Sequence, residues 1–442
     1  MVAAPVASGR RHYAWVVFTV TWVVLLLAAG MRAAPGVLIS PLHDALGFSK
    51  ADVGLAVSVN VLCYGFTGPF AAALLVRFGL RRVVPCALAL VAVGSLLAST
   101  VTAVWQLVVY WGLFVGIGTG CMAAVLAATV ANRWFVTRRG LVMGALMAAG
   151  ASGQVAFFQV LTRLTDHGPW QRVPQVVAAA ALLAAVPAAL FLRDKPEDVG
   201  QVAYGAPPDH RTPAGAPNPV RTAMRGLRVV SRSGAFWVLW GSFFVCGMST
   251  NGLIQTHFLE AAHDHDIART AAATLISLIG LFDIVGTVFS GWLTDRYDPR
   301  RLLFVYYGLR GLSLLLLQSA LSSGHLPLGA FIAFYGLDWV ATVPPTVALC
   351  RELCGAEMAT VAYGWVFAGH QVGASLAAWG AGLIRDATGS YQLAFMLAAV
   401  CCFVAAVGVL RVGRAAPADL APADPGPVDA GPVAGAPVGA LT

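Results

Sequence analysis

The sequence predicts an all-α membrane protein with twelve transmembrane helices in two six-helix halves, and three observations lead to this prediction. The chain has 442 residues, of which 58% are hydrophobic and only 11% charged, and its mean hydropathy is +0.76. Soluble domains carry about 25% charged residues, so this chain has too few charges to cover a surface in water. Apolar segments also recur along the chain, and Lys and Arg gather in every second gap between them.

Each apolar segment is long enough to cross a bilayer as a helix, which needs about 20 residues. Helices are expected because they satisfy backbone hydrogen bonds within the segment, and the sequence lacks the alternating stretches of a β-barrel. A cleaved signal peptide is the alternative for the first segment, which we expect to be retained because eleven more follow it. The segments lie at about residues 14–36, 51–76, 82–102, 105–130, 140–163, 173–193, 235–259, 270–293, 301–321, 327–349, 360–384 and 392–412.

The basic residues predict the orientation of the chain. With the N-terminus in the cytoplasm, 21 of the 28 Lys and Arg residues fall in inner segments and five in outer loops. Cytoplasmic loops of membrane proteins collect Lys and Arg, so both termini are expected in the cytoplasm. The net charge of +8 therefore has a cause other than nucleic-acid binding. The arginine-rich, alanine-rich composition is associated with bacteria, which suggests the bacterial inner membrane.

A polar, proline-rich gap divides the chain into two sets of six segments. The tail is almost all Ala, Pro, Gly, Val and Asp, a composition that cannot bury a core. The predicted parts are a cytoplasmic N-terminus at 1–13, a six-helix bundle at 14–193, a cytoplasmic linker at 194–234, a second bundle at 235–412 and a disordered tail at 413–442.

One loop occurs in both halves at an offset of 219 residues. Its second copy, G-x-L-x-D-R-x-x-x-R-R, runs from Gly291 to Arg301, and in the first copy Val76 replaces the acid. This repeat resembles the signature of the major facilitator superfamily, which implies a fold of two pseudo-symmetric halves. An acid and arginines in this loop suit a cytoplasmic gate, and the alternative is that the arginines only set topology. The candidate gate residues are Arg77, Arg81, Asp295, Arg296 and Arg300.

A second resemblance narrows the expected class of substrate. The stretch from Asn132 to Gly153, with N-R-W-F and R-R-G-L-V-M-G, is similar to the loop before the fifth span of monocarboxylate and oxalate:formate transporters. Phe282–Gly286 resembles them too, and together these stretches imply a small organic anion moved with a proton. The chain departs from those relatives at Thr287 and His370, where they carry basic residues.

Four ionisable residues lie inside predicted spans, where a charge costs several kcal/mol. Asp283 and Arg310 are candidates for proton coupling, and the alternative is a structural ion pair between them. Arg32 is a candidate for the substrate carboxylate, because a guanidinium binds a carboxylate through two parallel hydrogen bonds. Its alternative role is an ion pair with Asp338 or with an outer-loop acid such as Asp44.

Other polar residues in the spans complete the predicted substrate site. Hydrogen bonding between helices is the alternative for each of them. The superfamily resemblance implies that spans 1, 4, 7 and 10 line the cavity, and Pro344-Pro345 is expected to kink span 10. The predicted substrate-binding residues are Arg32, Asn60, Tyr64, Gln154, Asn251, Gln255, Asp338, His370 and Gln371.

The sequence thus predicts a proton-coupled secondary transporter of a small organic anion that works as a monomer in a lipid bilayer. No cofactor, catalytic set or metal site is expected, and the acids and histidines from Glu260 to Asp266 are expected to form a solvated outer loop. The alternatives are a transporter of a larger aromatic or neutral nutrient, a drug or metabolite exporter, and a membrane enzyme or receptor. ATP hydrolysis is disfavoured because the sequence has no G-x4-G-K-[ST] loop.

Overall fold

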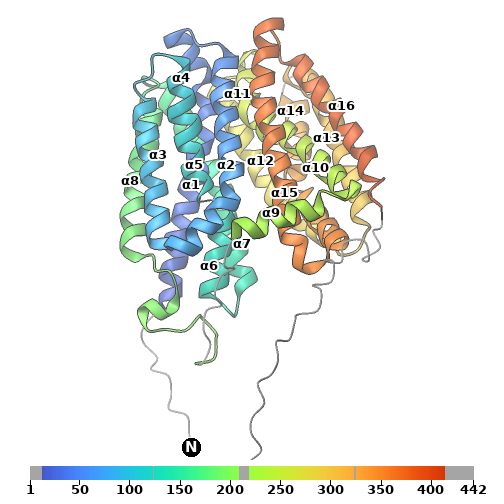
Figure 1. Ribbon diagram of the computed structural model, residues 1–442. Helices are drawn as coiled ribbons and strands as arrows, with labels where there is room; N and C mark the ends of the chain where they lie inside the picture. Colours follow the sequence, from blue (N-terminus) through green and yellow to red (C-terminus); the bar gives the residue numbers. More distant parts are fainter. Residues whose placement is uncertain (1–11, 123, 209–218, 323–324, 414–442) are drawn as a thin grey trace, which may run out of the picture.

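The computed structural model of the chain describes residues 12–122, 124–208, 219–322 and 325–413, and its named elements are helices (Figure 1). A single isolated bridge, between Phe135 and Tyr204, is the β pairing found within these ranges. Most of the predicted N-terminal segment, and nearly all of the predicted disordered tail, lie outside the described residues.

The first half of the chain forms one bundle, coloured blue to green in Figure 1. Its predicted fourth span is built from four consecutive helical pieces, one of which is a π-helical stretch. The elements are α1 (Tyr13–Leu46), α2 (Lys50–Phe78), α3 (Leu80–Ala98), α4 (Val104–Leu107), η1 (Val108–Val115), α5 (Gly116–Gly120), α6 (Ala124–Trp134), α7 (Arg139–Asp166) and α8 (Arg172–Phe191).

The linker and the second half follow, with the second bundle coloured yellow to red. A π-helical stretch, η3, again interrupts the first span of this half. The linker holds η2 (Pro196–Val199) and α9 (Pro219–Val230), and the second bundle holds α10 (Gly234–Gly247), η3 (Met248–Ile254), α11 (Gln255–His263), α12 (Arg269–Thr294), α13 (Pro299–Ser322), α14 (His325–Asp338), α15 (Val343–Thr388) and α16 (Gln392–Val409).

Eleven of the described helical stretches are long and apolar enough to cross a membrane. The predicted eleventh span, 360–384, is helical but is not among them, because His370, Gln371 and several glycines lower its hydropathy. It lies within α15, whose Glu352 pairs with Arg300 at the start of α13, whereas Asp386 contacts Lys50 at the start of α2. These two contacts lie on opposite faces of the bundle. Helix α15 therefore includes the end of the tenth crossing, near Glu352, and the eleventh crossing, which ends near Asp386.

The first helix is longer than the sequence predicted. The predicted span ended at residue 36, but α1 continues over Pro35 and Pro41 to Leu46. Gly47 then ends the helix in the left-handed conformation, with φ of 70°. Arg32 therefore lies near the middle of α1 and not near its outer end.

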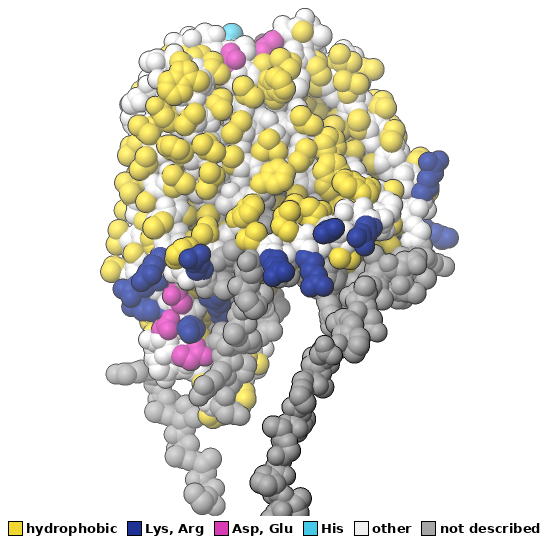
Figure 2. Space-filling model, in the orientation of Figure 1, with side chains coloured by type: hydrophobic (Ala, Val, Ile, Leu, Met, Phe, Trp, Pro, Cys, Tyr) yellow, Lys and Arg dark blue, Asp and Glu magenta, His cyan; other side chains and the backbone are white. Residues whose placement is uncertain are grey.

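The outside of the bundle is apolar and its lower rim is basic. Figure 2 shows a broad band of hydrophobic side chains above a row of Lys and Arg side chains. Exposed large residues such as Leu183, Val288 and Val404 form part of such a lipid-facing surface. The loops α2–α3 and α12–α13 and helix α9 lie on the rim that carries the arginines, which we call the basic side.

The two halves are joined on the face away from the basic side, which we call the opposite side. Helix α2 packs along α15 at glycines, and a Cβ on Gly54 would lie 2.3 Å from the Ala378 carbonyl oxygen. Small residues let helix backbones approach closely in membranes. The hydroxyls of Ser58 and Ser375 meet at 2.5 Å in the same contact.

Candidate functional site

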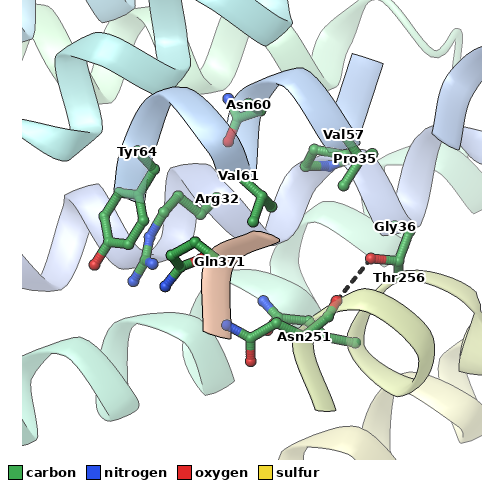
Figure 3. A pocket seen from close by; sticks show the side chains of 11 residues that line it. Arg32, Pro35, Gly36, Val57, Asn60, Val61, Tyr64, Asn251, Thr256 and Gln371 are labelled. Carbon is green, nitrogen blue, oxygen red and sulfur yellow. Dashed lines mark hydrogen bonds between the residues drawn. The ribbon is translucent and has the colours of Figure 1, made fainter. Parts of the chain in front are cut away.

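A small cavity of about 30 Å³ lies between the two halves, and Figure 3 shows the side chains that line it. They come from α1 and α2 on one side and from η3, α11 and α15 on the other. Arg32 is the only charged residue among them. The lining residues are Arg32, Pro35, Gly36, Val57, Asn60, Val61, Tyr64, Asn251, Gln255, Thr256 and Gln371.

Arg32 and Gln371 bring hydrogen-bond donors from the two halves into this cavity. The guanidinium of Arg32 lies over the ring of Tyr64, with its Cζ 4.2 Å from the ring centroid. Gln371 is 2% exposed, and its Nε2 has no hydrogen-bond partner within the described part of the chain. A buried donor without a partner costs about 1–3 kcal/mol, which a ligand oxygen would recover. Figure 3 shows the two side chains next to each other.

A second small cavity of about 70 Å³ adjoins the first, and Arg32 and Tyr64 line both. Its other walls come from α1, α5 and α7, including Met147, and from Met122 in the turn after α5. Arg32 therefore stands between two compartments, one shared by both halves and one within the first half.

Six of the nine predicted substrate residues line the cavity between the halves, and Gln154, Asp338 and His370 do not. Gln154 is on α7, one turn beyond Gly150 of the second cavity. His370 packs against the rings of Phe243 and Phe367, with centroids 5.4 Å apart in each case.

Two of the lining residues have a second role in packing. Asn60 is 3% exposed and donates from Nδ2 to the Trp111 carbonyl at 2.9 Å, which fixes α2 against η1. The Thr256 hydroxyl donates to the Asn251 carbonyl at 2.9 Å, which provides a partner for a backbone group within the π-helical stretch (Figure 3).

The predicted ion pair between Asp283 and Arg310 is not formed. Arg310 pairs instead with Asp338, with Nε 2.6 Å from Oδ2, and the guanidinium is 0% exposed. The alternative pairing of Arg32 with Asp338 is wrong for the same reason. Asp283 accepts hydrogen bonds from the Val340 backbone N–H at 3.0 Å and from the Thr287 hydroxyl at 2.9 Å.

These side chains satisfy the backbone where span 10 is broken. Helix α14 ends at Asp338 and α15 begins at Val343, just before the two prolines. Arg310 donates to the Trp339 carbonyl at 3.2 Å, and Asp283 accepts from Val340 N–H. Backbone groups freed by a break inside a membrane need such partners. The Pro344-Pro345 pair thus marks a real interruption of the helix.

The predicted cytoplasmic gate does not join the halves in this structure. Asp295, at the C-terminal end of α12, is exposed and makes no ion pair within the described residues. Arg300 pairs with Glu352 of its own half, with Nη2 2.7 Å from Oε1. Arg296 donates to the Trp292 carbonyl and lies over its ring. The contact between the halves is on the opposite side in this structure, so the latch at Asp295 stays a prediction.

In the first half, Asp194 from the linker takes the place of the missing acid. Its Oδ1 accepts from the Arg81 backbone N–H at 3.1 Å. Gly79 has φ of 82°, and a Cβ there would lie 2.1 Å from an Asp194 carboxylate oxygen. Arg77 lies over the ring of Phe78, with its Cζ 5.2 Å from the centroid. The repeat alone could not reveal Asp194, which lies over a hundred residues away.

The sequence also missed a buried charge pair that joins the halves on the opposite side. Glu260 was predicted in a solvated loop, but α11 continues to His263 and the Glu260 side chain is 0% exposed. It pairs with Lys50 at 2.9 Å and accepts a hydrogen bond from Ser40. Asp386 accepts from the Ala51 backbone N–H at 2.9 Å at the same place.

Comparisons with known proteins agree with this architecture. A model of the Major Facilitator Superfamily matches residues 21–261 and 256–438. An uncharacterized MFS-type transporter, YcxA of Bacillus subtilis, is 24% identical over 413 residues, which are 92% of this chain and 94% of that protein. Monocarboxylate transporter 13 of Rattus norvegicus is 28% identical over 391 residues, 87% of this chain and 86% of that protein.

Solved structures show the same fold at low identity. A bacterial homologue of the human lysosomal transporter Spinster, in an inward-facing conformation, superposes with a TM-score of 0.72 at 16% identity, over 92% of this chain and 100% of that chain. The D-xylose-proton symporter gives a TM-score of 0.67 at 14% identity, over 90% and 98% of the two chains. Since the family model covers both halves, the chain belongs to the Major Facilitator Superfamily and is a multi-pass membrane transporter, not an enzyme.

Proposed function

We propose that the chain is a secondary active transporter of a small organic anion of the monocarboxylate kind, and that it works by alternating access. The observation that carries this proposal is the cavity between the halves, where Arg32 and the unpartnered Gln371 Nε2 present donors from opposite sides. A ligand held by both halves is sensitive to their relative position, as alternating access requires.

The chemistry of the cavity favours a carboxylate. Arg32 offers a planar pair of N–H donors, which matches the two oxygens of a carboxylate. Among the residues that the structure describes, no acidic side chain lines the cavity to oppose an anion. Three kinds of relative named monocarboxylate transporters, numbered 11, 12 and 13, support the same substrate class.

Proton coupling is proposed to use Asp283. Its carboxylate is held by two neutral donors, Val340 N–H and Thr287, whereas the neighbouring Arg310 is engaged by Asp338. A half-buried carboxylate without a directly paired cation is a better proton acceptor than one in an ion pair. Protonation would weaken its hold on Val340 and so act on the break in span 10.

The remaining parts of the proposal concern the orientation of the chain, the membrane in which it lies and its oligomeric state. We place the basic side in the cytoplasm, with both termini there, because Lys and Arg concentrate on it. The arginine-rich, alanine-rich composition suggests a bacterial inner membrane. A complete cavity formed by one chain supports a functional monomer, with bundles proposed at 14–193 and 235–412 around a linker at 194–234.

Uptake into proteoliposomes tests the substrate class. Labelled lactate and pyruvate are expected to accumulate under an inward proton gradient. Arg32→Gln is expected to lower uptake at least tenfold, because it removes one charge-assisted pair of hydrogen bonds to the substrate. Arg163→Gln removes the same charge from an exposed site at the far end of α7 and is expected to leave uptake unchanged.

Three outcomes would contradict the proposal. Full carboxylate uptake by Arg32→Gln would remove Arg32 from the substrate site. Uptake of labelled aromatic or neutral solutes without any carboxylate uptake would favour the larger-nutrient alternative, and proton-driven efflux of cationic drugs would favour the exporter.

A further inference from the structure

Helix α9 of the linker is amphipathic and presents a row of arginines away from the protein. Its sequence is PVRTAMRGLRVV. Gly226 and Val230 are buried, whereas Arg221, Arg225 and Arg228 are exposed. Residues three and four positions apart share a helix face, so these arginines form one stripe.

Contacts with both halves fix the position of α9. It packs on α2 and on α15, and Figure 1 shows it lying across the base of the bundle. The Trp365 indole N–H donates to the Ala223 carbonyl at 3.0 Å, which ties the inner face of α9 to α15. The arginine stripe consequently points away from the two bundles at the basic side.

Two neighbouring features place this stripe at the level of lipid headgroups. Met224, beside the stripe, is 51% exposed, and Trp237 at the start of α10 is 53% exposed with its indole N–H bonded to the Ser231 carbonyl. Exposed tryptophans with a satisfied N–H collect at the membrane–water interface. Arg232 is also exposed and lies between the two helices. We call Arg221, Arg225, Arg228 and Arg232 the α9 basic face.

Three of the four arginines of this face, Arg225, Arg228 and Arg232, are outside the ion pairs of the described residues. The positive-inside rule explains why arginines occur in the linker, but it depends on the number of charges and not on their arrangement along a helix. It does not account for their alignment on one face beside an exposed methionine.

We infer that the α9 basic face binds the phosphate groups of anionic phospholipids in the leaflet on the basic side. Guanidinium groups form paired hydrogen bonds with phosphate oxygens, and a basic amphipathic helix lies in the interface with apolar side chains below the headgroups. Each arginine near an anionic surface contributes about fivefold to binding, and salt screens the effect. Because α9 packs on both halves, bound lipid also holds the linker helix in place across them.

Lipid binding to the purified full-length protein tests this site. The delipidated protein is mixed with equal amounts of phosphatidylglycerol and phosphatidylcholine, and bound lipids are counted by native mass spectrometry. Phosphatidylglycerol is expected to be preferred, and Arg225→Gln/Arg228→Gln is expected to reduce that preference roughly 25-fold at low salt. Excess inorganic phosphate is expected not to displace the lipid, because it lacks acyl chains.

A matched control removes the same charge elsewhere on the basic side. Lys195→Gln/Arg411→Gln changes two exposed residues outside α9 and is expected to retain the preference. Equal binding of the two lipids by the unmodified protein, or an unchanged preference in the α9 variant, would overturn the inference. Displacement by phosphate would assign the site to a free anion instead.

Hydrogen exchange gives a second readout that needs no substrate. In nanodiscs containing phosphatidylglycerol, backbone amides of α9 are expected to exchange several-fold more slowly than in phosphatidylcholine alone. This difference is expected to vanish in Arg225→Gln/Arg228→Gln while exchange in α2 and α15 stays as in the unmodified protein, which shows that the variant is folded. A lipid-dependent difference that persists in the variant would contradict the site.

Discussion

Two carboxylates beside the break in span 10 have different partners and so different expected roles. Asp338 is in a buried ion pair with Arg310, at 2.6 Å, and removing one member of such a pair leaves an uncompensated charge. Asp283 is half-buried, and within the described part of the chain its hydrogen bonds come from the neutral donors Val340 N–H and Thr287. Asp338 is therefore assigned to stability and Asp283 to proton coupling.

Replacing each acid by its amide separates these roles. Asp283→Asn is expected to abolish accumulation of the carboxylate under a proton gradient while exchange of labelled for unlabelled substrate continues, because no proton is needed for exchange. Its melting temperature is expected to stay within a few degrees of the unmodified protein. Both transport modes are measured in proteoliposomes.

Asp338→Asn is the comparison, and it is expected to lower stability by about 3–5 kcal/mol because the Arg310 charge stays buried. Proton-driven accumulation by Asp283→Asn at the normal level would remove that residue from coupling. A loss of folding in Asp283→Asn equal to that in Asp338→Asn would give it a structural role instead.

At the scale of the elements, glycines decide how closely α15 approaches its neighbours. A Cβ added at Gly373 would lie 1.9 Å from the Phe244 backbone oxygen of α10, which cannot move aside as a flexible side chain can. A Cβ at Gly364, in the same helix, would meet nothing within 4 Å. The two positions share a helix and differ only in their surroundings.

Alanine substitutions at these two glycines are expected to have opposite effects. Gly373→Ala is expected to destabilise the protein by about 1–3 kcal/mol, because α10 and α15 must move apart. Gly364→Ala is expected to be neutral or to stabilise by up to about 1 kcal/mol, since alanine is the better helix former. Thermal unfolding followed by circular dichroism measures both. Equal melting temperatures for the two variants would mean that the α10–α15 contact is loose.

At the scale of the whole molecule, charges that join the halves hold the opposite side closed. Lys50 and Glu260 come from different halves and are 13% and 0% exposed. The Arg385–Asp264 pair lies on the same side, but both its residues belong to the second half. Only the first pair must separate when the halves move apart there.

Glu260→Gln is therefore expected to favour opening of the opposite side by roughly tenfold or more, because Lys50 loses its counter-ion. Hydrogen exchange at the α2 backbone amides of residues 50–54 reports that opening and is expected to become faster. Asp264→Asn, the matched control, is expected to leave this exchange unchanged. Equal acceleration in both variants would show that the effect is a local loosening of the loop.

The class of protein, the two halves and the four ionisable residues inside the predicted spans could be read from the sequence, whereas the buried Lys50–Glu260 pair could not. Scarcity of charge and recurring apolar segments follow directly from the solvent properties of a bilayer, so they are readable without a fold. The repeated loop predicted the superfamily, and the family match confirmed that prediction. Six of nine predicted substrate residues also line one cavity, because polar residues inside spans face the protein interior.

Which of these residues contact one another depends on how the helices pack. Depth along a helix does not tell which neighbour a side chain faces, and Arg310 pairs with Asp338 although Asp283 lies close by. The closure at Glu260 and Lys50, and the replacement of the missing loop acid by Asp194, join residues more than a hundred positions apart. The packing of the helices determines which residues become partners. This packing cannot be inferred from the order of residues in a single sequence.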